Sequence, residues 1–161
     1  MNIRPFRNIN RRVTKEIKVG NVKIGNTNPV SVQSMTKTDT RDIEKTVEQI
    51  NELEMAGCDI IRCAVPNIDA AKSLKDIILK TKLPIVADIH FEYRLALEAI
   101  KSGVHGLRIN PGNIGQKKRI ISVVQSAKDS NIPIRIGVNS GSLEKDLLEK
   151  FRKIENEKSN P

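Results

Sequence analysis

The sequence predicts an α/β fold, namely the first five βα units of a partial (β/α)8 TIM-type barrel behind an N-terminal β-hairpin. Five short runs rich in Val and Ile alternate with longer segments of helical periodicity, an order typical of a parallel sheet. In the last four runs one parity is apolar, while the other carries charged or amide side chains toward the C-terminal end. A doubly wound sheet is apolar on both faces, so this pattern favours a barrel with its site at the strand ends.

The predicted elements follow in order along the chain. A hairpin is expected within residues 15–27, around a turn at Gly20–Asn21. Strands are expected at 30–34, 59–65, 85–90, 106–110 and 134–139, where Pro84 and Pro133 open two of them. Helices are expected at 39–56, 69–80 and 92–102, after Gly115, and from Ser142 as N-cap. Residues 110–115 are expected to form a turn into the fourth helix.

Apolar residues at helical spacing justify these helices. The predicted inward-facing residues are Ile43, Val47, Ile50 and Leu53, then Leu74, Ile77 and Ile78, and later Ile120, Ile121, Val124 and Ala127. The division of the chain is therefore an arm and hairpin at 1–29, five βα units at 30–143, and a charged helix or tail at 144–161. A closed barrel needs about eight units, which predicts either that this chain is the first part of something longer or that it pairs with another copy.

Bulk properties restrict the classes of function. The chain has 161 residues and a formal net charge of +9, which suits nucleic acid, an anionic membrane or acidic small molecules. Aromatic residues make up only 2%, so stacking on nucleic-acid bases has little support, and no run is apolar enough to span a membrane. The two cysteines are Cys58, just before the second predicted strand, and Cys63 within it; if one extended segment includes both, they lie on opposite faces. They are predicted to be reduced and buried, which indicates a cytoplasmic protein.

Three arginines on the polar strand face form the strongest candidate site. Arg62, Arg108 and Arg135 come from neighbouring strands, and guanidinium groups bind phosphate oxygens bidentately, so together they could hold a diphosphate. The alternative is that each arginine pairs with an acid, for example Arg62 with Asp88. Asp88 and His90 share that face and could act as an acid/base pair, metal ligands or substrate hydrogen-bonders, or Asp88 could cap the next helix. With two histidines in the chain, a metal site is not predicted.

Further polar residues have open roles at this stage. Asn110 and Asn139 end strands on the same face as Arg108 and Arg135. Ser31, Gln33 and the Ser34–Thr36 segment could orient a substrate or simply cap a turn. His105 precedes a strand and is expected to be solvated, and the basic run 116–119 is expected to form a solvated helix face.

Five ordered motifs resemble the 4-hydroxy-3-methylbut-2-enyl diphosphate synthase (IspG/GcpE) family. They are SVQSMT at 31–36, AGCDIIR at 56–62, VADIHF at 86–91, LRINPGNIG at 107–115 and IPIRIGVNSGSLE at 132–144. The resemblance implies an oxidoreductase of the methylerythritol phosphate route to isoprenoids (terpenoid biosynthesis). Its reaction is the reductive ring opening and dehydration of 2-C-methyl-D-erythritol 2,4-cyclodiphosphate.

The resemblance also implies partners and residue roles. Electrons come from flavodoxin or ferredoxin through a 4Fe-4S cluster, held in a separate C-terminal domain that caps the barrel of the other subunit of a homodimer. By motif, Arg62, Arg108 and Arg135 grip the diphosphate, while Asp88, His90, Asn110 and Asn139 surround the carbon skeleton and hydroxyls.

The chain departs from the family pattern, because the later barrel units and the cluster-bearing domain are not in the sequence. The cluster needs about four closely spaced ligands, so the 161 residues alone are expected to be inactive. Three other interpretations are a pterin- or phosphate-binding barrel similar to dihydropteroate synthase, a non-catalytic anion-binding module, and a decayed remnant.

Overall fold

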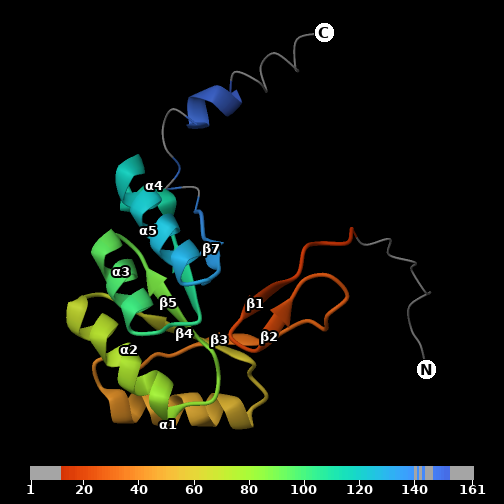
Figure 1. The fold of residues 1–161 in the computed structure, drawn as a ribbon, viewed down its shortest axis with the longest axis vertical. Coiled ribbons are helices and arrows are strands. Elements are labelled where there is room, and N and C mark those ends of the chain that lie inside the picture. Colours follow the sequence, from red (N-terminus) through yellow and green to blue (C-terminus); the bar gives the residue numbers. More distant parts are fainter. Residues whose placement is uncertain (1–11, 140, 142, 144–146, 153–161) are drawn as a thin grey trace.

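The computed structural model describes residues 12–139, 141, 143 and 147–152. It contains a hairpin, a parallel sheet and the helices that connect its strands (Figure 1). The strands are β1 (Ile17–Val19), β2 (Val22–Ile24), β3 (Gln33–Met35), β4 (Ile60–Ala64), β5 (Ile85–Ile89), β6 (Gly106–Ile109) and β7 (Ile134–Ile136). The helices are α1 (Ile43–Met55), α2 (Ile68–Lys80), α3 (Tyr93–Lys101), α4 (Pro111–Ile114) and α5 (Lys117–Asp129).

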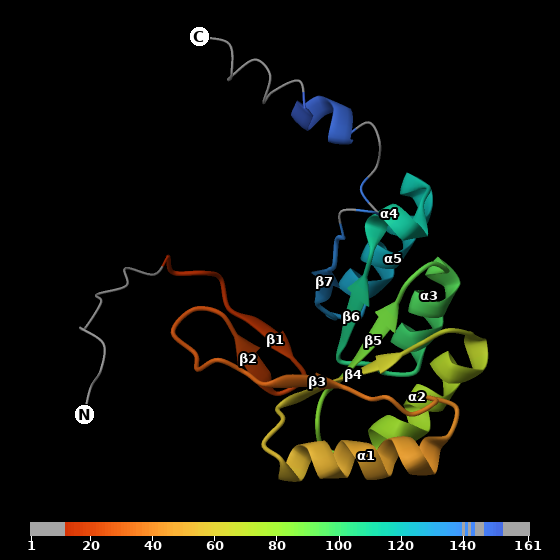
Figure 2. The ribbon, with the colours of Figure 1, turned by 180° about the vertical axis from the view of Figure 1, so that it is seen from behind.

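The sheet has the strand order of successive βα units. Its five parallel strands run β3-β4-β5-β6-β7 in sequence order, so each helix crosses between neighbouring strands. Helices α1, α2, α3 and α5 lie on one side of the sheet, and the hairpin β1–β2 lies on the other (Figures 1 and 2). The predicted α/β order is confirmed, and within the described residues the sheet is open, with β3 and β7 as its edges.

The helix-covered face of the sheet holds the main core. Ile61, Cys63, Ile85, Ala87 and Ile89 are fully shielded from solvent there and pack against helices α1 to α3 and α5. Burying an Ile side chain contributes about 1.5–3 kcal/mol relative to leaving it exposed, so this face accounts for much of the fold's stability. The alternation predicted for β4, β5 and β6 is confirmed.

The hairpin closes the N-terminal end of the opposite, concave face. Val19 of β1 packs on Ile60 and Val86, which point away from the helices. Its turn has a positive φ at Gly20 (+58°) but not at the next residue, the pattern of a type II′ turn. A side chain at Gly20 would also approach Pro84 to 2.9 Å and His105 to 3.0 Å, so only glycine fits beneath the sheet. The predicted hairpin and its turn are confirmed.

The sequence predicted a solvated His105 side chain, and the structure shows that this was wrong. It is only partly exposed, and its Nδ1 accepts a hydrogen bond from the backbone N–H of Ile85 at 3.1 Å. Burial lowers the pKa of the His105 imidazole. This histidine therefore serves as a neutral link between β5 and the start of β6.

The two edge strands differ from their predicted ranges. The first was expected at 30–34, yet the ladder begins at Gln33, because Val30 lies outside it and is 86% exposed. The last was expected to reach residue 139 but ends at Ile136. Ile136 and Val138, expected on the buried parity, are 65% and 51% exposed, since no described helix covers β7 at that point. Period-two patterning identifies a face but not whether another element covers it.

The helices begin and end close to the predicted positions, with two corrections. The first starts at Ile43 instead of residue 39, because Asp42 accepts a hydrogen bond from the N–H of Lys45 and caps it. The predicted turn at 110–115 contains the short helix α4, with Pro111 in its first turn and Gly115 at its end.

The predicted apolar stripes of α1 and α2 are confirmed, whereas that of α5 is partly wrong. Helix α5 buries Val123 and Ala127 but leaves Ile121 and Val124 about half exposed. The residues of α5 that pack on the core are at positions 120, 123 and 127. Ile121 and Val124 each follow one of them by a single position, which rotates the side chain by about 100° around the helix axis and away from the core.

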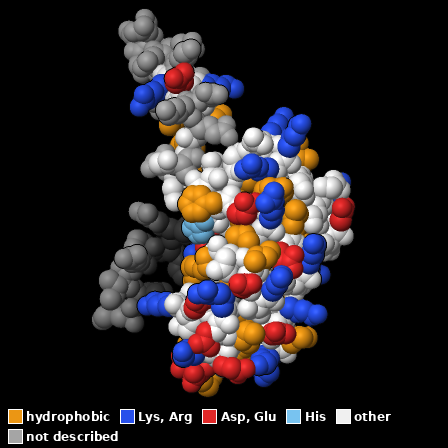
Figure 3. Space-filling view, turned by 90° about the vertical axis from the view of Figure 1, so that its left-hand side faces the viewer, with side chains coloured by type: hydrophobic (Ala, Val, Ile, Leu, Met, Phe, Trp, Pro, Cys, Tyr) orange, Lys and Arg blue, Asp and Glu red, His pale blue; other side chains and the backbone are white. Residues whose placement is uncertain are grey.

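The described residues end in a helical segment at 147–152, whereas the predicted N-cap Ser142 lies outside the described residues. Acidic and basic side chains are interspersed over the helix-covered side of the molecule (Figure 3). Among the described helices, none combines the length and apolar character that a membrane crossing requires.

Candidate functional site

The candidate site lies on the concave face, where the strand register places polar residues in a row. Asp88 of β5 is directly beside Arg108 of β6, and Arg108 is directly beside Arg135 of β7. Residues paired across parallel strands point to the same face, with strands about 4.8 Å apart. Arg62 lies two residues nearer the N-terminal end of the strands, level with Met35 and Val86. The parity argument from the sequence therefore placed these four side chains on one face, as the register has them.

Asp88 is the centre of this row. Its side chain is almost fully buried, and its carboxylate contacts Arg62 Nε at 3.3 Å and Arg108 Nη1 at 3.2 Å. His90 Nε2 lies 3.4 Å from the same carboxylate, while the imidazole itself is half exposed. One acid thus joins two of the three predicted arginines and the predicted histidine. The acid-pairing alternative holds for Arg62 and Arg108, whereas α3 is capped by Glu92 and not by Asp88.

Arg62 and Arg135 have additional uncharged partners on β3. The Nε and Nη2 groups of Arg62 lie 3.3 Å and 3.2 Å from the sulfur of Met35. Arg135 Nη1 donates a hydrogen bond of 2.8 Å to the side-chain Oε1 of Gln33. β3 and β7 are opposite edges of the sheet, so this last hydrogen bond spans the concave face.

A cavity of about 750 Å³ opens on the same face. Its wall near the hairpin is apolar, with Val19, Ile60 and Val86, and its polar wall includes Gln33, Ser34, Arg62 and Arg135. Arg108 and Asp88 lie beyond its lining, at the C-terminal ends of the strands. The cavity therefore leads from the hairpin to the charged row.

The remaining predicted residues lie at the C-terminal ends of β6 and β7. Asn110 is buried immediately before α4, and Asn139 is exposed three residues after β7. Sequence reasoning left the role of Gln33 open and missed Gly137. A Cβ added at Gly137 would lie 2.7 Å from the Cζ of Arg108, so the guanidinium rests on the glycine backbone. The parity of Gly137 with Arg135 was visible in the sequence, but the contact with Arg108 depends on side-chain conformation.

The two cysteines do not fit an iron–sulfur cluster. Both thiols are free and buried; Cys63 faces the helices, and Cys58 donates to the backbone carbonyl of Ile60 at 3.1 Å. Burial raises the pKa of the Cys63 thiol to about 11, which disfavours the thiolate that a metal requires. Within the part of the chain that the structure describes, no group of three or more His, Cys, Asp or Glu side chains is placed to share a metal ion.

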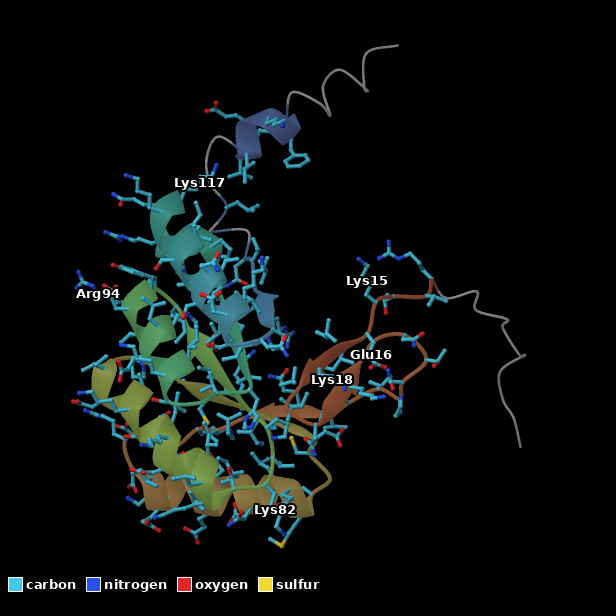
Figure 4. The ribbon with its side chains drawn as sticks, viewed as in Figure 1. Lys15, Glu16, Lys18, Lys82, Arg94 and Lys117 are labelled. Atoms are coloured by element: carbon cyan, nitrogen blue, oxygen red, sulfur yellow. The ribbon has the colours of Figure 1, made fainter. Side chains whose placement is uncertain are left out.

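Several other cations lie on the helical layer or on the hairpin, outside the row of strand residues. Arg94 of α3 and Lys117 of α5 project outward from the helical layer, and Lys15 and Lys18 belong to the hairpin (Figure 4). Arg94 and Arg119 each lie within 6 Å of the Tyr93 ring, which occupies them in cation–π contacts. The basic run 116–119 is exposed, as predicted.

The amino-acid sequence matches the model of a known protein family. A family model described as the GcpE TIM-barrel domain matches residues 14–159. The chain belongs to the GcpE family. This agrees with the five motifs and with the parallel sheet of βα units.

Two curated relatives carry the same name. The chain is 66% identical over 141 residues to the 4-hydroxy-3-methylbut-2-en-1-yl diphosphate synthase (flavodoxin) of Clostridium acetobutylicum, covering 88% of this chain and 40% of the relative. It is 63% identical over 143 residues to the protein of that name from Thermodesulfovibrio yellowstonii, covering 89% of this chain and 41% of the relative. The chain thus spans about 40% of the length of these relatives.

Solved structures of dihydropteroate synthases share the fold with this GcpE chain. The enzyme from Yersinia pestis matches with a TM-score of 0.59 at 9% identity, covering 88% of this chain and 54% of its own. The enzyme from Vibrio fischeri matches with a TM-score of 0.57 at 13% identity, covering 75% and 48%. At such low identity the likeness shows the barrel architecture alone.

Proposed function

We propose that this chain supplies the diphosphate-binding part of a 4-hydroxy-3-methylbut-2-enyl diphosphate synthase. The substrate is 2-C-methyl-D-erythritol 2,4-cyclodiphosphate, which undergoes reductive ring opening and dehydration. One observation carries the proposal: three guanidinium groups share one concave face with a single carboxylate, which pairs with two of them, so two positive charges of this row are left uncompensated. A cyclic diphosphate bears one negative charge on each phosphorus and matches that surplus.

The proposed roles follow from position. Arg62, Arg108 and Arg135 bind the diphosphate, and Asp88 orients the first two through its carboxylate. His90 is half exposed beside Asp88, an arrangement that can pass a proton to a substrate hydroxyl. Asn110 and Asn139 follow Arg108 and Arg135 at the strand ends, and their proposed role is to contact the carbon skeleton and its hydroxyls.

Arg108→Ala tests the binding site. Arg108 is mostly buried and adjoins both Asp88 and Gly137, so its loss removes a charge-assisted contact at the centre of the row. We expect the dissociation constant for the cyclic diphosphate, measured by titration calorimetry, to rise at least about tenfold. Arg94→Ala removes the same charge from the outer surface and is expected to leave binding unchanged. Equal weakening in both variants would indicate general attraction to a basic protein and contradict the proposal.

The electron-transfer part of the reaction is proposed to depend on residues beyond these 161. The buried thiols of Cys58 and Cys63 do not suit a cluster, so no step is assigned to them. The relatives' names support flavodoxin as the electron donor, and the resemblance supports a 4Fe-4S cluster and a homodimer. Two reduced, buried thiols support a cytoplasmic location.

A polypeptide of these 161 residues alone is expected to bind the cyclic diphosphate without converting it. The reason is that the ring opening requires electrons, and the chain's own cysteines are poorly suited to deliver them. The measurement is product formation in the presence of reduced flavodoxin, followed by phosphorus NMR. Turnover by the purified polypeptide would overturn the assignment of electron transfer to other residues, while leaving the binding site intact.

A further inference from the structure

We propose that Gln33 is a positioning residue that holds Arg135 toward the diphosphate while leaving its charge uncompensated. The proposal rests on the function proposed above and extends it to a residue whose role the sequence left open. Gln33 lines the cavity together with Arg62 and Arg135. It lies on β3, the edge strand farthest from β7, where Arg135 lies.

The contact between the two residues joins opposite edges of the open sheet. Arg135 Nη1 donates to Gln33 Oε1 at 2.8 Å, although the residues are 102 positions apart in sequence. No neighbouring strand brings them together, since three strands separate β3 from β7. The hydrogen bond therefore fixes the direction of the Arg135 side chain across the cavity mouth, a direction that the backbone alone does not set.

The chemistry of the partner distinguishes Arg135 from the other two arginines. Arg62 and Arg108 share the carboxylate of Asp88, which offsets part of their charge. Within the described residues, Arg135 makes its one side-chain hydrogen bond to a neutral amide and forms no ion pair. A guanidinium has five N–H donors, so an amide can orient it through one donor and leave the others for a ligand oxygen.

A carboxylate at position 33 would hold Arg135 equally well but would neutralise it. The surplus positive charge of the site would fall from two to one, and the new acid would repel the incoming anion. The neutral amide is therefore the feature that makes this contact suited to a doubly charged diphosphate. Gln33 touches Arg135 and is not assigned a part in the chemical step.

The experiment compares four variants of the chain: Gln33→Glu, Gln33→Met, Arg135→Ala and the double variant Gln33→Met/Arg135→Ala. Titration calorimetry gives the dissociation constants for inorganic pyrophosphate and for the cyclic diphosphate, and thermal unfolding checks that each variant folds. Gln125→Glu adds the same negative charge on the outer helix α5 and serves as the matched control.

We expect Gln33→Glu to raise the dissociation constants of both ligands by about tenfold. Gln33→Met is expected to raise them by about threefold, because methionine removes the hydrogen bond to Arg135 without adding a negative charge. In the Arg135→Ala background, Gln33→Met is expected to change both dissociation constants by less than half of its effect in the parent chain, since the arginine that Gln33 orients is gone. Gln125→Glu is expected to bind as the parent chain does.

The outcomes separate the two proposals. Equal binding by the parent chain and Gln33→Glu, or a full effect of Gln33→Met without Arg135, overturns the role of Gln33 and leaves the proposed function standing. Failure of the folded parent chain to bind either ligand overturns the diphosphate site and the role of Gln33 with it.

Discussion

Asp88→Asn is expected to destabilise the protein while tightening its binding of pyrophosphate. The substitution keeps the shape of the side chain but removes the one carboxylate that faces Arg62 and Arg108. The positive charges of Arg62 and Arg108 then lie close together without the negative charge that offset them. Breaking a fully buried ion pair costs about 3–5 kcal/mol. Because solvent reaches both arginines in part, we expect a smaller loss, about 2 kcal/mol in the free energy of unfolding.

The same substitution raises the surplus positive charge of the site from two to three. A bound diphosphate then supplies the missing negative charge, so its dissociation constant is expected to fall about fivefold. Urea unfolding followed by circular dichroism gives the stability, and titration calorimetry gives the affinity. Asp76→Asn, which removes an exposed carboxylate from α2, is the matched control and is expected to change neither quantity appreciably. Unchanged stability in Asp88→Asn would contradict the assignment of Asp88 as the centre of the arginine row.

Opposite changes in stability and affinity are informative because a simple loss of folding cannot produce them. A variant that merely unfolds binds less ligand, whereas this variant is expected to bind more per folded molecule. A bound ligand also restores stability by mass action, so pyrophosphate should raise the unfolding midpoint of Asp88→Asn more than that of the parent chain.

The sequence predicted the faces of the strands better than their ends. Alternation placed Asp88 and Arg108 on the polar face and Ile89 and Ile109 in the core, because side chains in a strand must alternate. It could not show that Val30 would lie outside the ladder or that Ile136 would be exposed. Those outcomes depend on which elements lie alongside an edge strand, which is a tertiary property.

The contacts within the site were predictable to different degrees. The pairing of Arg62 with Asp88 was one of two open alternatives, since residues on one face of neighbouring strands come within reach of each other. The contact of Gln33 with Arg135 was not predictable, because it depends on how far the sheet curls to bring its edges together. The packing of Arg108 on Gly137 was not predictable either, because it depends on the rotamer of a long, flexible side chain.

Gly137→Ala is expected to reduce diphosphate binding without reducing stability. The added methyl group would lie 2.7 Å from the Cζ of Arg108, which is too close, so the guanidinium must move. The moving group is the end of a flexible side chain, and the φ of Gly137 is not in the left-handed region, so alanine fits the backbone without strain. We therefore expect the free energy of unfolding to change by less than about 0.5 kcal/mol.

The displaced guanidinium is expected to keep its ion pair with Asp88 but to lose its alignment with the ligand, so that the dissociation constant for the cyclic diphosphate rises about tenfold. Gly141→Ala is the matched control, because among the described residues a methyl group there would meet no atom within 4 Å. Calorimetry on both variants, with unfolding measured in parallel, separates the two effects. Normal binding by Gly137→Ala would mean that Arg108 does not need this position to hold the ligand. Weak binding with intact stability would show instead that a residue without a side chain decides where the central arginine of the site points.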